Sequence, residues 1–158
     1  MNLYEDYKVV QAFEPKTTNA AISSNYLTLK DAITATVIVN LAQGVGNATQ
    51  VSLYQAKDVS GTGAKPLLNN VPIWVNEDTG TSDALVRESD GVSYTVANTA
   101  KNKQIIFHVD PPKLDLNNGY PCLGVKIGAS SQATNFAFGE FILEMKYGQA
   151  DPPSVLVD

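Results

Sequence analysis

The sequence predicts an all-β fold, an antiparallel β-sandwich of jelly-roll-like type with extended N- and C-terminal arms. Three observations predict it. Apolar residues alternate with polar ones at period two in the apolar segments, which is the pattern of half-buried strands. These segments are short, recur roughly every ten residues and are separated by Gly, Asn and Asp turns. No stretch requires a helix of ordinary length, so the strands are expected to form two sheets packed face to face.

The clearest strand is TATVIVNL at residues 34–41, which is rich in β-branched residues and has one apolar face. A glycine-containing turn at 43–47 and an alternating segment at 49–57 follow, which predicts that the two strands form a hairpin. Further strands are expected at 26–30, 71–75, 84–88, 92–97, 103–110, 120–127 and 136–147.

Two of these strands carry residues that disturb a regular ladder. Pro72 has no N–H to donate, so the strand at 71–75 is expected at a sheet edge or to start at the proline. Gly139-Glu140 interrupts the alternation of the last strand, which is typical of a β-bulge.

The chain is expected to form one domain with a segment at each end. We expect residues 1–25 to be an N-terminal arm or edge segment, 26–147 the β-sandwich domain and 148–158 a C-terminal tail. Residues 7–13 have the pattern of a short strand that ends at Glu14-Pro15. The N-terminal segment is therefore expected to be either a free arm or an edge strand of the main sheet. The prolines near both ends predict that residues 1–16 and 148–158 serve contacts more than core stability.

The composition excludes several classes of function. At 158 residues and 44% hydrophobic content, the chain is long enough to bury a core without disulfides, and its one cysteine cannot form an internal one. The net charge is −5 and the basic residues are scattered, which argues against nucleic-acid binding. No signal peptide and no membrane span is expected, because no apolar run is long enough.

His108 and Cys122 are the candidate catalytic residues, because a lone histidine or thiol can serve a hydrolase. On a strand, Asp110 shares a face with His108 but lies roughly 7 Å away, too far for a direct bond without side-chain reach. Cys122 follows a proline in an apolar strand, without the positive setting that a reactive thiol needs. We therefore interpret His108 as an ordinary strand residue and Cys122 as a small buried hydrophobe.

The acidic residues and the glycine-rich loop are candidates for metal and phosphate binding. The carboxylates Glu77, Asp78 and Asp83 share one loop, and Asp110 and Asp115 flank Pro111-Pro112. Their spacing matches no compact calcium loop, and solvated loop acids are the expected outcome. The segment from Gly61 to Lys65 lacks the P-loop pattern, because Pro66 follows the lysine, and the sequon Asn47-Ala48-Thr49 has no secretory signal. We expect no catalytic, cofactor or metal site.

Aromatic side chains offer the remaining binding chemistry. Tyr54, Trp74, Tyr94 and Tyr120 would suit a sugar-binding platform on a β-sandwich, and core and rim packing explains them equally well.

Four segments carry a family resemblance. They are LKDAITATVIVNLA (29–42), VSLYQAKDVSGTGAKPL (51–67), FHVDPPKLDLNNGYPCLGVKI (107–127) and KYGQADPPSVLVD (146–158). In their order of strands and turns they resemble small structural proteins of tailed bacteriophages, several of which are head decoration, or cement, proteins. The resemblance covers residues 26–158 and carries no residue-level site.

The resemblance implies a structural virion protein without enzymatic activity. Such a protein binds the outside of the assembled capsid, with the major capsid protein as partner and a homotrimer as the expected assembly. It is made in the host cytoplasm and resides on the outer surface of the virion, with no nucleic acid or membrane as partner. Two alternatives remain: a carbohydrate-binding β-sandwich module, and another phage morphogenetic component of the neck or tail.

Overall fold

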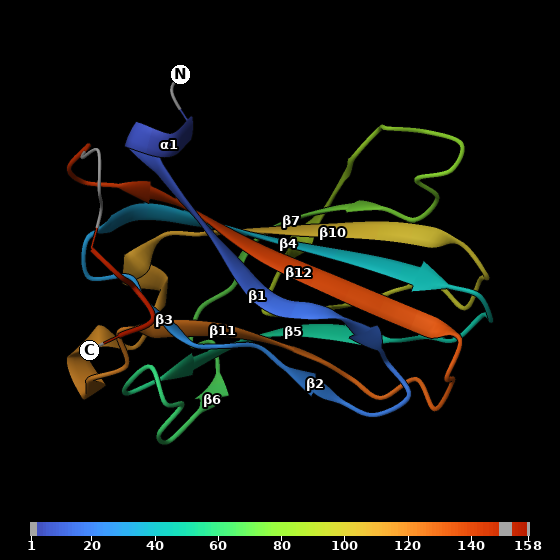
Figure 1. Ribbon diagram of the computed structural model, residues 1–158, viewed down its shortest axis with the longest axis horizontal. Helices are drawn as coiled ribbons and strands as arrows, with labels where there is room; N and C mark the ends of the chain where they lie inside the picture. The colour runs from blue at the N-terminus through green and yellow to red at the C-terminus, as the bar shows by residue number, and fades with distance from the viewer. Residues whose placement is uncertain (1–2, 149–152, 158) are drawn as a thin grey trace.

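The computed structural model describes residues 3–148 and 153–157. Two antiparallel sheets pack face to face, with sheet A above sheet B in Figure 1, and their inward-facing side chains form the core. Within the described residues the only α-helix is the four-residue α1 (Leu3–Asp6). The predicted all-β sandwich is confirmed.

Sheet A has the strand order β1-β12-β4-β10-β7-β8, and every neighbouring pair is antiparallel. Its strands are β1 (Tyr7–Thr17), β12 (Asn135–Met145), β4 (Ala32–Gln43), β10 (Asn102–Val109), β7 (Val71–Asn76) and β8 (Val86–Gly91). Burial alternates at period two along β4, β10 and β12, because every second side chain points into the core.

Sheet B has the order β2-β11-β5-β6, with β3 also paired to β11 and β9 also paired to β5. Its strands are β2 (Ile22–Ser23), β11 (Cys122–Ile127), β5 (Gln50–Ala56), β6 (Lys65–Pro66), β3 (Leu27–Thr28) and β9 (Ser93–Thr95). Two short 3-10 turns, η1 (Pro111–Lys113) and η2 (Leu116–Asn118), connect β10 of sheet A to β11 of sheet B.

The predicted hairpin of the strands at 34–41 and 49–57 is wrong. Strand β4 lies between β12 and β10, so both of its hydrogen-bonding edges are occupied and none remains for β5. Residues 44–49 instead carry the chain to sheet B, where β5 pairs with β11. The chain crosses again between β8 and β9, so it passes repeatedly from one sheet to the other, as in a jelly roll.

Of the two alternatives left open for the N-terminal segment, the structure has the edge strand. β1 pairs with β12 along its length and buries Val10, Ala12 and Phe13. Pro15 does not end the strand, because it lies at a register shift between the paired residues Phe13 and Lys16. The expectation that residues 1–16 add little to core stability therefore needs correction.

The residues after β1 are also packed rather than free. Thr18, Ile22 and Ser24 are all buried, and Ser24 exchanges hydrogen bonds with Val125 of β11. Residues 18–25 thus lead the chain from sheet A to sheet B along one edge of the sandwich (Figure 1).

The interruption at Gly139-Glu140 has a different cause from the predicted bulge. β12 pairs with β4 without a shift from Asn135 to Glu144, so no bulge occurs there. The shift lies in the neighbouring strand β1, between Gln11 and Phe13. The Phe13 ring lies against Gly139, where a Cβ atom would approach Phe13 Cε1 to 2.5 Å. Glycine is present because an aromatic ring covers the backbone, not because the strand bulges.

Pro72 does not place its strand at an edge. β7 lies between β10 and β8, so the edge interpretation is wrong. Its pairs with β10 run from Ile73 to Asn76, which leaves Pro72 outside that ladder, near the start of the strand. The missing proline N–H therefore interrupts no pair with β10.

The C-terminal segment contributes to the core as far as it is described. Val155 is 4% exposed and packs in the main hydrophobic cluster, and its carbonyl accepts a hydrogen bond from Thr28 N at 2.9 Å. Lys8 Nζ donates to the Pro153 carbonyl. The tail expectation for residues 149–152 and 158 lies outside the described residues.

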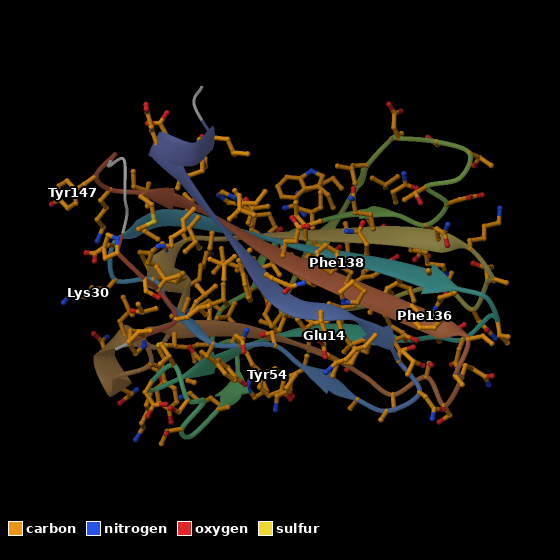
Figure 2. The ribbon with its side chains drawn as sticks, viewed as in Figure 1. Glu14, Lys30, Tyr54, Phe136, Phe138 and Tyr147 are labelled. Carbon is orange, nitrogen blue, oxygen red and sulfur yellow. The ribbon has the colours of Figure 1, made fainter. Side chains whose placement is uncertain are left out.

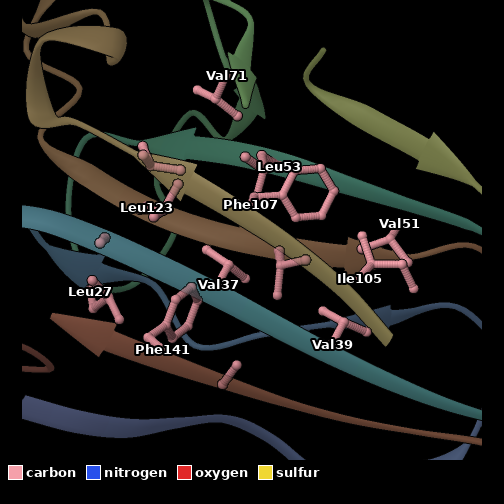
Figure 3. Close-up of a cluster of buried hydrophobic side chains, with 14 of the residues drawn as sticks. Leu27, Val37, Val39, Val51, Leu53, Val71, Ile105, Phe107, Leu123 and Phe141 are labelled. Atoms are coloured by element: carbon pink, nitrogen blue, oxygen red, sulfur yellow. The ribbon is translucent and has the colours of Figure 1, made fainter. Parts of the chain in front are cut away.

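Figure 3 shows the core between the sheets, where Val37, Ile105 and Phe107 of sheet A face Leu53 and Leu123 of sheet B. Such burial is the main favourable term in the folding of the domain.

One charged side chain belongs to this interior. Lys103 is fully buried, with Nζ 3.0 Å from Glu77 Oε2 and donating to the Ala97 carbonyl. Glu77 Oε1 accepts hydrogen bonds from the Tyr94 hydroxyl at 2.8 Å and from Ala97 N at 3.1 Å. Because Lys103 is on β10 and Tyr94 on β9, this network ties the two sheets together at one end.

Candidate functional site

His108 and Asp110 are closer than the strand spacing indicated. Both side chains are partly exposed and they reach one another, with Nε2 3.4 Å from Asp110 Oδ1. The distance of roughly 7 Å applied to the backbone positions, and side-chain length closes it. Within the described residues Asp110 is the only recorded partner of this imidazole, so the arrangement has no nucleophile for the histidine to activate.

Cys122 lies at the start of β11 and is 1% exposed. It packs with Tyr26 and Ala56 in a small apolar cluster on the outer side of sheet B. This is the environment of a small buried hydrophobe, as interpreted from its neighbours.

Two of the loop acids are held by neighbouring lysines. Asp78 pairs with Lys101, and Asp115 pairs with Lys65 at 2.6 Å, and in both cases the lysine is the main cause that holds the carboxyl pKa below its usual range. Asp83 is exposed. Within the described residues no three or more His, Cys, Asp or Glu side chains are arranged to hold a metal ion.

The glycine-containing loop between β5 and β6 is organised by Asp58. Its Oδ1 accepts hydrogen bonds from Ser60 N and Thr62 N, each at 3.0 Å. The Thr62 side chain, and after it these backbone groups, lower the pKa of the carboxyl. Gly61 and Gly63 have positive φ, and β6 follows rather than a helix. This geometry is a tight turn. It does not present the helix N-terminus that a phosphate loop requires. In the Asn47 sequon, the side-chain amide donates to the Ser130 carbonyl.

The four aromatic residues expected as a sugar platform do not share one face. Trp74 is on the outer face of sheet A, and Tyr54 is on the outer face of sheet B under Lys126 Nζ, 4.0 Å from the ring centroid. Tyr94 binds Glu77, and Tyr120 lies under Lys65 Nζ at 4.0 Å. These four residues therefore form no common binding surface.

Two features on the outer face of sheet A stand out instead. The first is an apolar strip across five strands, which we name the sheet A strip: Val9, Ile142, Ile38, Ile106 and Trp74 on β1, β12, β4, β10 and β7. Val9 pairs directly with Ile142, and Ile106 pairs with both Ile38 and Trp74. Ile142 and Ile38 are diagonal neighbours, because Ile142 pairs with Thr36.

The sheet A strip is accessible from outside. Val9 is 47% exposed and the other four residues are half-buried. Arg87 of β8 lies over the Trp74 ring, 4.9 Å from its centroid, and marks one end of the strip. Both inner sheet faces already pack against each other, so these outward side chains do not contribute to the core between the sheets. Contiguous exposed apolar patches occur at interaction sites, so the sheet A strip is a candidate binding surface.

The second feature, which we name the Phe136 pocket, is a hollow of about 340 Å³ at the end of the same face where β12 begins. It is lined by Pro15, Asn40, Leu41, Ala42, Thr79, Asn102, Lys103, Phe136, Ala137 and Phe138. Phe136 and Phe138 follow one another along β12 (Figure 2), and Phe136 is 49% exposed.

Sequence reasoning missed both features because it treated each strand as having one apolar face. A usable signal was present: the strands at 103–110 and 136–147 carry isoleucine or phenylalanine on both faces, and the strand at 34–41 carries Ile38 on the face opposite Val37 and Val39. Strands that are apolar on both faces are expected where both faces are covered. In the described part of the chain, the strip and the pocket both lie on this second, outward face.

Within the described residues no helix is long and apolar enough to cross a membrane. Neither a protein family nor a curated protein matches this sequence.

Several solved structures are similar to this chain. The SPBc2 prophage-derived protein YomS shares 14% identity over 87% of this chain and 92% of its own, with a TM-score of 0.49. The PBSX exported protein XepA shares 15% identity over 86% of this chain but only 37% of its own length, with a TM-score of 0.45. A carbohydrate-binding module of Cel9A from Ruminococcus flavefaciens shares 12% identity over 90% of this chain and 99% of its own, with a TM-score of 0.37. Similarity at this level assigns no family and no activity.

Proposed function

We propose that this chain is a structural protein of a tailed-phage particle that binds the outside of the assembled capsid and stabilises it. The observation that carries the proposal is the sheet A strip, an outward apolar surface on a rigid sandwich. The sequence resemblance to head decoration proteins supplies the partner, the major capsid protein. The net charge of −5 suits a protein on the outer surface, which does not need to bind the packaged genome.

The proposal describes a binding protein rather than an enzyme. The thiol of Cys122 is buried in an apolar cluster, His108 pairs with Asp110, and Asp78 and Asp115 pair with lysines. Binding through a sheet face instead requires area and shape, and a stable interface buries at least about 1,000 Å². The sheet A strip with its polar margins would form one part of such an interface in a homotrimer on the virion surface.

The test is attachment of purified protein to undecorated capsids, measured by co-sedimentation. Ile106→Asp places a charge in the centre of the sheet A strip and should weaken attachment by at least about tenfold, equivalent to about 1.4 kcal/mol. Ser52→Asp on the outer face of sheet B is the matched control and should attach like the parent protein.

Electron microscopy of the decorated particle would locate the protein, and sedimentation velocity would report the expected trimer. If Ile106→Asp remains folded and attaches as well as the parent protein, the strip is not the capsid-binding surface. Density in the neck or tail would replace the capsid role with another morphogenetic role.

A further inference from the structure

The Phe136 pocket presents no charged group to a ligand. None of the five residues of the sheet A strip lines it. Its position follows from one small residue: Ala42 pairs with Phe136 on β12 and with Asn102 on β10. Because the alanine side chain ends at Cβ, the larger side chains of Phe136 and Asn102 project further from the sheet on either side of Ala42. Ala42 therefore forms the floor of the pocket. The Lys103 side chain is fully buried on the inner face of β10, and its ammonium group lies with Glu77 rather than in the pocket.

Flat apolar groups form part of the wall. Phe136 and Phe138 lie on the outer face of β12, and Pro15 of the edge strand β1 borders them. The register places β1 beside this part of β12, with Thr17 paired to Phe136. Aromatic rings and a proline ring present broad faces to a ligand at little cost in conformational entropy.

Polar groups without partners complete the lining. Asn40 Oδ1 accepts a hydrogen bond from Gln104 Nε2 at 3.0 Å, which orients the Asn40 amide and leaves its Nδ2 group uncommitted within the described residues. The side chains of Asn102 and Thr79 likewise have no hydrogen-bond partner in the described part of the chain, although Thr79 N donates to the Asn102 carbonyl at 2.9 Å and holds the loop in place. An amide offers both donors and acceptors.

The combination of aromatic rings and unpaired amide groups in the pocket favours some classes of ligand over others. An apolar peptide side chain would fill the hollow but strip water from the amides of Asn40 and Asn102 without replacing their hydrogen bonds, which is costly. A charged ligand would find no counter-charge in the lining. A pyranose ring has an apolar face of C–H groups that fits an aromatic ring, and edges of hydroxyl groups that donate to and accept from amides.

We propose that the Phe136 pocket binds one sugar residue of a neutral glycan, through the rings of Phe136 and Phe138 and the polar groups of Asn40, Asn102 and Thr79. The volume, about 340 Å³, lies at the lower end of the range for small-molecule sites and suits one sugar unit. The proposal does not depend on capsid attachment, because the sheet A strip uses other residues.

The experiment is an NMR titration of the full chain with four probes: chitohexaose, cellohexaose, maltohexaose and a linear rhamnose hexasaccharide. Signals of the Asn40 and Asn102 side-chain amides and of the Phe136 and Phe138 rings report the pocket. Binding of at least one probe is expected, with a dissociation constant of about 0.1–1 mM, which is typical of a shallow site with few polar contacts.

Two variants and one control make the result specific. Phe136→Ala removes an exposed ring, and Ala42→Leu fills the hollow without removing any contact group, so both should weaken binding at least about tenfold, or about 1.4 kcal/mol. Tyr54→Ala on the opposite sheet should bind like the parent protein. Thermal unfolding of all variants shows whether the fold is retained.

The proposal is overturned if none of the four probes shifts the pocket signals. It is also overturned if Ala42→Leu binds within twofold of the parent protein, or if N-acetylphenylalaninamide shifts the pocket signals while no sugar does. Attachment of the pocket variants to undecorated capsids should stay unchanged, so failure of the sugar site and failure of the capsid proposal are distinguishable.

Discussion

At the scale of single residues, two glycines let aromatic rings lie directly on the backbone of a sheet. Gly139 receives Phe13 on the core side of sheet A, and Gly124 of β11 receives Tyr26 on the outer side of sheet B. A Cβ atom at position 124 would approach Tyr26 Cε1 to 2.6 Å. Tyr26 is 8% exposed, so its ring has little room to move, and burial is the main cause that raises the pKa of its hydroxyl.

We therefore expect Gly124→Ala to lower the free energy of unfolding by about 1–3 kcal/mol, because the added methyl group overpacks a filled site. Urea unfolding followed by tyrosine fluorescence measures it. Gly80→Ala is the control, since a Cβ there meets only Asp78 Oδ1 at an ordinary 3.5 Å. Equal stabilities of the two variants would show that the Tyr26 ring moves aside freely.

The buried Lys103 gives a second prediction at this scale. Glu77→Ala leaves a fully buried ammonium group without its carboxylate and should cost about 2–3 kcal/mol, less than for a fully buried pair because a third of the Glu77 side chain is exposed. In a Lys103→Met background the same substitution should cost clearly less, since no charge is then left unpaired. A double-mutant cycle by urea unfolding measures the coupling, and additive effects would contradict it.

At the scale of elements, the terminal segments are parts of the sandwich. β1 forms an edge of sheet A, and the segment at 153–157 places Val155 beside β3. Pro15 is compatible with a strand at this edge because the ladder is already irregular there. Both segments therefore contribute buried area, which free arms do not.

Val155→Asp should lower the free energy of unfolding by about 2–4 kcal/mol, because it removes a buried apolar side chain and buries a charge. Val157→Asp changes the same residue type two positions later, where the side chain is 69% exposed, and should have an effect below about 0.5 kcal/mol. Thermal denaturation by circular dichroism compares them. Identical melting curves would mean that residue 155 does not hold the position described.

At the scale of the whole molecule, stability should be highest between acid and alkaline limits set by groups with shifted pKa values. The carboxyl pKa values of Asp58, Asp78 and Asp115 are lowered, so their contribution is present above about pH 4 and is lost as the pH falls through their folded-state values. The hydroxyl pKa values of Tyr26 and Tyr94 are raised, Tyr94 mainly by burial and then by Glu77. Their contribution is present below about pH 10 and is lost as the pH rises further.

We expect the urea midpoint of unfolding to fall below about pH 4 and above about pH 10. Between these limits the aspartates and tyrosines named above should change the midpoint little. Tyr94→Phe should lower stability at neutral pH, because the bond to Glu77 is lost, and should make the fall above about pH 10 shallower. Unfolding curves across the pH range measure both effects. An unchanged alkaline limb in Tyr94→Phe would show that Tyr94 is not one of the groups that set it.

The sequence by itself determined the all-β class, the positions of most strands and the burial of Cys122, because these depend on period-two alternation and on the apolar character of near neighbours. Only the tertiary structure decided which strands pair. β4 and β5 are neighbours in sequence but lie in different sheets, since β10 and β12, far away in the chain, occupy both edges of β4. The same long-range pairing places Ala42 between Phe136 and Asn102, and Ile106 between Ile38 and Trp74. The pocket and the strip therefore exist only once the sheet is assembled, because no local pattern records which strands will be neighbours.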